Sequence, residues 1–188
     1  PPSRDDQMKI LVFGKTGQVG IELQRQADVT AIDRTQADLS DPTACAEIIR
    51  HTDADVIINA AAYTNVDQAE VNESLATTIN VVAPAEMAKA AATRGLPFLH
   101  ISTDYVFDGL GSTARAPEEP TAPINAYGRS KLAGEQGVAA CGGTYAILRT
   151  SWVFSAHGTN FVKTMLRIGR EHSALSVVDD QIGGPTPA

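Results

Sequence analysis

The stretch that decides the fold runs from Met8 to Gln26 and reads MKILVFGKTGQVGIELQRQ. Residues 8–13 have the apolar character of a buried strand, and glycines follow at positions 14, 17 and 20. Val19 and Leu23 lie four residues apart, which indicates a helix over 17–26. A glycine turn between a strand and a helix lets a backbone approach a pyrophosphate at the helix N-terminus. This stretch therefore predicts a phosphate-binding crossover at the start of the chain.

Strands and helices alternate along the rest of the chain. The alternation of short apolar strands with helices predicts an α/β fold with a Rossmann-like, doubly wound parallel sheet. Such a sheet binds ligands beyond the carboxyl ends of its strands. The expected further strands are 28–33, 55–60, 98–103, 144–150 and 174–178, the expected helices are 41–50, 72–93, 125–140 and 159–170, and 108–123 is a long loop.

Composition excludes several classes of protein. The 188 residues are 43% hydrophobic, which suits one core, and their apolar runs fall short of the roughly 20 residues that span a membrane. A net charge of −7 disfavours nucleic-acid binding. Cys45 and Cys141 form no CxxC pair, and the four histidines lack metal-ligand spacing, so we expect reduced thiols and no metal site. Residues 1–7 are expected to be a polar leader, and the absence of a signal-peptide pattern favours a cytoplasmic protein.

The glycines Gly14, Gly17 and Gly20 form GxxGxxG, a variant of the usual dinucleotide pattern GxGxxG. Asp33 follows 19 residues after Gly14, where an acid would bind the adenosine ribose hydroxyls. Arg34 comes next and could pair with a 2′-phosphate, so the choice between NADPH and NADH stays open. The simpler alternative is a plain strand-to-helix turn. A P-loop is disfavoured because GxxxxGK[ST] is absent.

Tyr127 and Lys131 form a second candidate site in the segment YGRSK. Four residues apart on a helix, they share one face. A lysine ammonium there is expected to lower the pKa of the tyrosine, and the phenol could then give a proton to a carbonyl oxygen as a hydride arrives on the carbon. The alternative is an amphipathic helix start with a solvated lysine.

Two strand ends add polar or small residues. Ser102 and Thr103 end the strand 98–103, where a hydroxyl could hold the substrate oxygen; the two point to opposite faces, and either could serve. A strand cap is the plainer interpretation. Asn59 is followed by three alanines, which would let a nucleotide lie against the backbone or a helix pack closely against the strand.

Taken together, these segments resemble one family. The motifs are GKTGQVG (14–20), NAAAYTNVDQAE (59–70), ISTDYVFDG (101–109), YGRSK (127–131), LRTSWVF (148–154) and NFVKTMLR (160–167). They are similar to those of the dTDP-4-dehydrorhamnose reductases, which are extended short-chain dehydrogenases/reductases. The resemblance implies reduction at C4 of a dTDP-4-keto-6-deoxy sugar by NADPH or NADH, giving dTDP-L-rhamnose.

The resemblance also assigns roles to residues. Thr103, Tyr127 and Lys131 would be the catalytic triad, with Tyr127 the proton donor. Asp104, Phe107 and Trp152 match positions near the sugar. The cofactor would be surrounded by Gly14, Gly17, Gln18, Val19, Gly20, Asp33, Arg34, Asp38, Leu39, Ala60, Ala61, Ala62, Tyr63, Tyr127 and Lys131.

Members of this family continue past the equivalent of GGPT (183–186) into a small C-terminal substrate domain. The resemblance therefore implies that residues 8–188 are an NAD(P)-binding domain and that the substrate domain is largely absent. A monomer or homodimer is expected. The alternatives are a related deoxysugar ketoreductase of secondary metabolism, a nucleotide-sugar epimerase or dehydratase, and a non-catalytic regulatory subunit like the β subunit of methionine adenosyltransferase. Tyr105 occupies the position where dehydratases of this kind carry an acid, which argues against dehydration.

Overall fold

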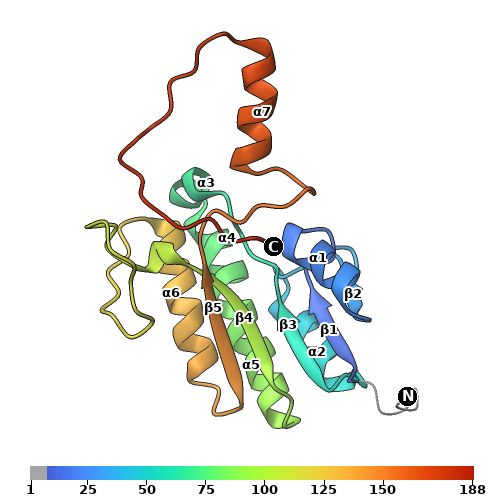
Figure 1. Ribbon diagram of the computed structural model, residues 1–188. Coiled ribbons are helices and arrows are strands. Elements are labelled where there is room, and N and C mark those ends of the chain that lie inside the picture. Colours follow the sequence, from blue (N-terminus) through green and yellow to red (C-terminus); the bar gives the residue numbers. More distant parts are fainter. Residues whose placement is uncertain (1–7) are drawn as a thin grey trace.

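The computed structural model describes residues 8–188, so the expected polar leader 1–7 lies outside the described residues (Figure 1). Within that range, parallel strands form one sheet in the order β2-β1-β3-β4-β5. The strands are β1 (Ile10–Phe13), β2 (Thr30–Ile32), β3 (Val56–Asn59), β4 (Phe98–Thr103) and β5 (Tyr145–Thr150). The sequence-based expectation for these elements is confirmed.

Helices α2, α3, α6 and α7 begin at a residue whose side chain caps the first turn. Asp41 accepts a hydrogen bond from Ala44 N ahead of α2, and Asn125 accepts one from Gly128 N ahead of α6, so each satisfies a backbone donor of the first turn. The elements are α1 (Gln18–Gln26), α2 (Pro42–His51), α3 (Val66–Val71), α4 (Glu73–Thr77), the π-helical turn η2 (Thr78–Val82), α5 (Ala83–Thr93), the 3-10 turn η3 (Asp104–Val106), α6 (Ala126–Ala139) and α7 (Phe161–Glu171).

The chain winds in both directions from the centre of the sheet. From β1 it passes through α1 to β2 at one edge, and then returns through α2 to β3 on the other side of β1. Right-handed crossovers place α1 on one face and α2, α5 and α6 on the other. The predicted doubly wound sheet is confirmed, and its direction reverses between β1 and β3. A ligand crevice is expected beyond the carboxyl ends of those two strands.

The main core lies between the sheet and α2, α5 and α6. Phe13, Ile57 and Phe98 of the sheet are buried against Met87 of α5 and Val138 of α6. Each such side chain stabilises the fold by roughly 1.5–3 kcal/mol relative to exposure. This layer fixes the position of α6, which carries the YGRSK segment. No helix among the described residues is long and apolar enough to cross a membrane.

The helix expected over 72–93 is interrupted. Helix α4 gives way to the π-helical turn at Thr78, and α5 resumes at Ala83. Asn80 in this turn accepts a hydrogen bond from Tyr63 N and donates to Tyr63 O, which ties the turn to the loop after β3. Pro84 has no backbone N–H to donate to the preceding turn. The hydrogen bonds of Asn80 to Tyr63 and the lack of an N–H at Pro84 therefore explain why the regular helical hydrogen bonds are interrupted here.

The prediction of a strand at 174–178 is wrong. This segment is irregular, and its apolar side chains Leu175, Val177 and Val178 are exposed. Beyond the end of β5 the chain pairs instead with its last residues: Thr186 N donates to Ser151 O at 2.9 Å, and Ala188 N donates to Phe154 O at 3.1 Å. Apolar residues in this segment indicate that it could be buried as a strand. They do not show whether a neighbouring strand is available for it to pair with.

Candidate functional site

The glycine loop closes tightly at the crevice between β1 and β3. Gly14 has φ +102°, and a Cβ on it would lie 2.9 Å from the carbonyl carbon of Ala60. A Cβ on Gly20 would lie 2.1 Å from Gly14 O, so α1 also approaches the loop as closely as backbone allows. A side chain at either position would clash with these backbone atoms, so only glycine lets the loop pack this closely against the end of β3 and the start of α1. The free amides at the start of α1 suit an anion there.

A cavity of about 380 Å³ opens at this loop. It joins three regions that are far apart in the sequence: the glycine loop, the end of β3 and the YGRSK helix. Its lining comprises Thr16, Gly17, Gln18, Val19, Ala60, Ala62, Thr64, Ile101, Ser102, Tyr127, Lys131, Thr150, Val153, Gly158 and Thr159. The structure thus brings the predicted cofactor loop and the predicted catalytic pair to one cavity.

The acidic end of β2 lies beside the glycine loop, because Gly14 N and Lys15 N both donate to Ile32 O. Hydrogen bonds from the Thr35 side chain and backbone hold the pKa of Asp33 below its usual value, so this carboxylate is ionised and can accept from hydroxyls.

The neighbouring expected cofactor residues have other contacts. Arg34 pairs with Asp38 at 2.9 Å, and Leu39 is buried in the main core. Neither of these lines the 380 Å³ cavity. Tyr63 binds Asn80 through both its backbone N–H and its carbonyl, and its side chain packs against the core.

Tyr127 is buried, with 9% of its surface exposed. Burial raises the pKa of Tyr127 to about 12, although the hydroxyl of Thr103 acts in the opposite direction. The expectation that Lys131 lowers this pKa is not met. Lys131 Nζ instead donates to Ile101 O at 2.7 Å and lies 3.3 Å from His100 Nε2. Burial disfavours the charged form of Lys131 and lowers its pKa to about 8.

The two hydroxyls at the end of β4 have different partners. Ser102 Oγ donates to Glu135 Oε1 at 2.5 Å on α6, beside the ion pair of Glu135 with Arg149. Thr103 Oγ1 accepts from Tyr105 N at 3.2 Å, and the same hydroxyl lowers the pKa of Tyr127. Thr103 Oγ1 also donates to Asp104 Oδ1 at 3.2 Å, and Ser102 but not Thr103 lines the 380 Å³ cavity, so the hydroxyl of Ser102 is engaged with Glu135 while that of Thr103 is the one that acts on Tyr127.

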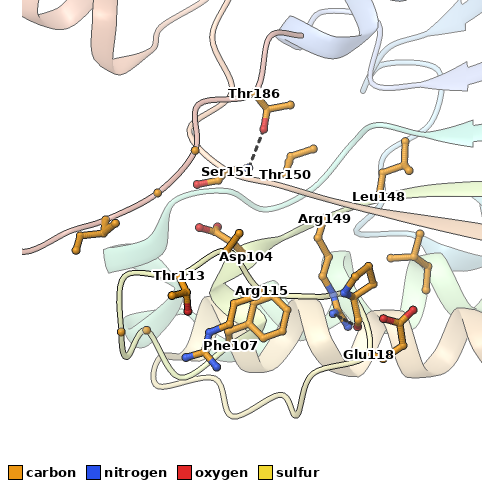
Figure 2. Close-up of a pocket in the computed structure, with 18 of the residues that line it drawn as sticks. Asp104, Phe107, Thr113, Arg115, Glu118, Leu148, Arg149, Thr150, Ser151 and Thr186 are labelled. Atoms are coloured by element: carbon orange, nitrogen blue, oxygen red, sulfur yellow. Dashed lines mark hydrogen bonds between the residues drawn. The ribbon is translucent and has the colours of Figure 1, made fainter.

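A second cavity, of about 1090 Å³, lies beyond β5 and under the loop 109–118 (Figure 2). Asp104 and Phe107 line it, and the guanidinium of Arg149 lies 5.0 Å from the Phe107 ring centroid. Trp152 is not part of this lining, but its backbone is left-handed at φ +47° and its ring approaches Gly183 at the cavity edge. The three expected substrate residues therefore lie at or beside one hollow.

Sequence reasoning missed several polar contacts at these cavities. The amide of Gln18 is occupied: it donates to Val153 O and accepts from Asn160 Nδ2, so it anchors the segment before α7. Ser151 Oγ is buried without a hydrogen-bond partner among the described residues, at the wall of the larger cavity. His100 was considered only as a metal ligand, yet it contacts Lys131. Such contacts join distant residues and leave no local pattern.

The doubly wound sheet, with a glycine loop at its switch point, places this chain in the Rossmann-like class of α/β proteins. The chain belongs to the RmlD substrate binding domain family, whose model matches residues 8–188. The family membership inferred from the motifs is thereby confirmed.

Named relatives agree with this assignment. The chain is 47% identical to a dTDP-4-dehydrorhamnose reductase of Burkholderia thailandensis and 46% identical to one of Salmonella typhimurium. These alignments cover 95% and 96% of this chain but 61% and 63% of the relatives. A crystal structure of a dTDP-4-dehydrorhamnose reductase from Bacillus anthracis in complex with NADP matches with TM-score 0.92 at 39% identity, covering 96% of this chain and 66% of that one. The chain thus spans about three fifths of the length of these curated relatives.

Proposed function

We propose that the protein carrying this chain reduces the C4 keto group of dTDP-4-dehydrorhamnose with NADPH or NADH, forming dTDP-L-rhamnose. The observation that carries the proposal is the shared cavity, which Tyr127, Lys131 and the glycine loop line together. Relatives named dTDP-4-dehydrorhamnose reductase, one of them solved with NADP, support the substrate and the cofactor.

In this proposal the crevice between β1 and β3 holds the dinucleotide. The free amides at the start of α1 would face its pyrophosphate, and Asp33 would accept from its ribose hydroxyls. Of the remaining expected cofactor residues, Gln18, Val19, Ala60 and Ala62 line the same cavity. When bound, the nicotinamide supplies the hydride that reaches the C4 carbon of the sugar.

The protein's own residues handle the proton. Tyr127 keeps its phenolic proton because burial raises its pKa to about 12, so it can donate to the C4 oxygen as that oxygen becomes an alkoxide. The hydroxyl of Thr103 helps to hold the same oxygen. Lys131 shares the cavity with Tyr127 and sets the charge beside it. The hydride on carbon and the proton on oxygen together complete the alcohol.

The larger cavity is proposed as the nucleotide-sugar side of the site. Asp104 and Phe107 line it and Trp152 stands at its edge, next to the end of β4 where Thr103 lies. Its volume of about 1090 Å³ exceeds that of the dinucleotide cavity and suits a large ligand. We also propose that the protein is cytoplasmic and acts as a monomer or homodimer.

The residue after Asp104 supports reduction over dehydration. Tyr105 packs edge-on against Tyr127, with 5.6 Å between ring centroids, and burial raises its pKa. This position therefore offers no acid to assist loss of water. Turnover and product analysis separate this reaction from three alternatives: a related deoxysugar ketoreductase, an epimerase and a regulatory subunit.

The test uses the full-length protein and its Tyr127→Phe variant. We expect wild type to oxidise NADPH or NADH only with a dTDP-4-keto-6-deoxyhexose, and the variant to lose about 10²–10⁴-fold in kcat, the usual contribution of general acid catalysis. Cofactor binding, followed by nucleotide fluorescence, should be nearly unchanged. Undiminished turnover in the variant would sink the role of Tyr127.

Product analysis completes the test. NMR of the product fixes the sugar and the configuration at C4, which separates the proposed reaction from that of a related ketoreductase. Product epimerised without net oxidation of the cofactor would identify an epimerase. If no nucleotide-keto-sugar consumes NADPH or NADH, the regulatory interpretation replaces the enzymatic one.

A further inference from the structure

The segment 153–160, which joins β5 to α7, forms one wall of the dinucleotide cavity. Val153, Gly158 and Thr159 line this cavity together with Gln18 at the start of α1. The segment lies outside the strands and helices, and the helix α7 into which it leads stands away from α2, α5 and α6 (Figure 1). Its position at the cavity is therefore set by individual contacts and not by the packing of regular elements.

The side-chain amide of Gln18 makes the central contact. Gln18 Nε2 donates to Val153 O at 3.1 Å, and Gln18 Oε1 accepts from Asn160 Nδ2 at 2.8 Å. Ser155 Oγ lies 3.2 Å from the same oxygen. Asn160 is buried, with 9% of its surface exposed. Both ends and the middle of the segment thus meet at one side chain of α1.

The backbone fixes the orientation of both amides. A carbonyl can only accept, so the NH₂ of Gln18 faces Val153 O and its oxygen is left for Asn160. Lys163 N can only donate, and it does so to Asn160 Oδ1 at 3.0 Å. The NH₂ of Asn160 therefore faces Gln18 and Ser155 O. Each amide has one orientation that satisfies its partners, and each needs the other.

The segment is compact in itself and lies close to the Gln18 side chain. Gly158 has φ +61°, and a Cβ on it would lie 3.2 Å from Gln18 Cγ. Lys163 Nζ donates to Ala156 O at 3.0 Å and to Gly158 O at 2.8 Å, which ties the segment to the first turn of α7. The segment and the start of α7 therefore form one unit, and Gln18 attaches this unit at the cavity.

Further contacts of the segment lie away from the cavity. Phe154 N donates to Thr186 O at 3.0 Å. His157 Nε2 lies 3.3 Å from Glu22 Oε1 and 3.2 Å from an Arg25 nitrogen of α1. The His157 side chain is 35% exposed, and ion pairs at exposed positions contribute little. None of these residues lines the dinucleotide cavity.

We propose that Gln18 is a positioning residue whose side-chain amide holds the segment 153–160 as a wall of the dinucleotide cavity and thereby slows release of the cofactor. A wall that is fixed before binding loses little conformational freedom when the ligand arrives, so its contacts with the ligand contribute more to affinity. The inference rests on the proposed function, which places a dinucleotide in this cavity. It gives the side chain of Gln18 a task separate from that of the glycine-loop backbone.

Release of NADPH from the full-length protein tests the proposal without any sugar. Excess NADP⁺ displaces bound NADPH in a stopped-flow instrument, and the nucleotide fluorescence gives koff. Gln18→Leu nearly keeps the size of the side chain but removes both hydrogen bonds. Asn160→Ser keeps a good cap for α7 but is too short to reach Gln18. Each variant should raise koff about tenfold, the value of one hydrogen bond, and an unchanged koff in Gln18→Leu would overturn the proposal.

The Asn160→Ser variant separates a held wall from a direct contact between Gln18 and the cofactor. Asn160 does not line the cavity, so its side chain affects release only through the segment. We expect the double variant to release NADPH about as fast as Gln18→Leu alone, because both changes break the same connection. A wild-type koff in Asn160→Ser, or effects of the two changes that multiply in full, would refute the proposal.

Matched controls exist for both changes. Gln26→Leu lies at the exposed end of α1, and Asn65→Ser replaces the cap of α3, so both should leave koff unchanged. His157→Gln removes only the exposed contact with Glu22 and should change koff by less than about twofold.

Hydrogen exchange shows whether the variants act locally. Amides of 153–160 should exchange faster in Gln18→Leu and in Asn160→Ser, while those of α6 keep their protection, because the opening is confined to the segment. Faster exchange in α6 as well would show a general loss of stability and overturn the assignment.

Release of the dinucleotide does not require turnover, so this inference can fail separately from the proposed function. If NADPH binds and its release is the same in wild type and variants, the role of the Gln18 side chain is refuted while the proposed reaction stands. If the full-length protein binds neither NADPH nor NADH, the proposed function and this inference fail together.

Discussion

Lys131 links burial to the pH dependence of stability. Its folded pKa is about 8, whereas an unfolded lysine titrates near 10.5, so between these values the unfolded chain binds more protons. Stability from this group is therefore lost as pH falls from 10.5 to 8 and gained as pH rises. Relative to Lys131→Met, wild type should gain up to about 1.4 kcal/mol per pH unit in this window.

Urea unfolding of both proteins at pH 7.5, 8.5 and 9.5 measures this difference. Burial raises the pKa of Cys45 to about 11 and that of Tyr127 to about 12, but both groups are present in both proteins and cancel in the comparison. Parallel stability curves above pH 8 would show that Lys131 is not desolvated as the structure has it.

Single residues were predictable where a motif carries them. Gly17, Tyr127 and Lys131 belong to motifs of fixed spacing, and their convergence at one cavity follows from the edge at which parallel strands end. The pairing of Lys131 with His100 was not predictable, because it joins residues 31 positions apart through side chains alone. The difference between Ser102 and Thr103 likewise depends on Glu135, which lies on another element.

Among the elements, α6 shows how closely helix and turn must pack. A Cβ on Gly134 would lie 2.0 Å from Asn80 O in the π-helical turn η2. Gly134→Ala should therefore push α6 away from η2 and lower the free energy of unfolding by about 1–3 kcal/mol, as expected for overpacking. The displacement would reach Ser130 and Lys131, one turn earlier on the same helix.

Gly169→Ala is the matched control for this prediction. Gly169 is also helical, but nothing lies within 4 Å of a Cβ placed on it, so the change should be neutral or stabilise α7 by helix propensity. Equal effects of the two substitutions in urea unfolding would contradict the close contact between α6 and η2.

The elements were predictable to the extent that local chemistry determines them. The helices expected over 41–50 and 125–140 do begin at these positions, where Asp41 and Asn125 cap the first turns. The break at Thr78 could not be predicted, since it depends on the bonding of Asn80 to Tyr63, 17 residues away. Alanine-rich composition indicates a helix but does not show whether its turns are regular.

At the scale of the whole molecule, the sheet and its single large core follow from the order of apolar segments, whereas the region after β5 does not. Figure 1 shows α7 away from the layer formed by α2, α5 and α6. Helical periodicity correctly placed α7, but periodicity does not reveal which surface a helix packs against. The same holds for 174–178, whose apolar residues suggested a sixth strand.

The placement of α7 predicts how stability is distributed in this chain. None of its residues is buried, and Phe161, Val162 and Leu166 are all exposed. Leu166→Ser should therefore change the free energy of unfolding by less than about 0.5 kcal/mol, as at other surface positions. Met87→Ala in the core should cost about 2–5 kcal/mol because it leaves a cavity.

Hydrogen exchange measures the same distribution without mutation. The amides of α7 should exchange through local opening, well before those of α6, since helices without buried apolar contacts open at low free energy. Amides in α7 as protected as those in α6, together with a cost above 2 kcal/mol for Leu166→Ser, would show that α7 packs against the core in solution. The apolar face of α7 would then be buried in solution, and the prediction that α7 contributes little to stability would be wrong.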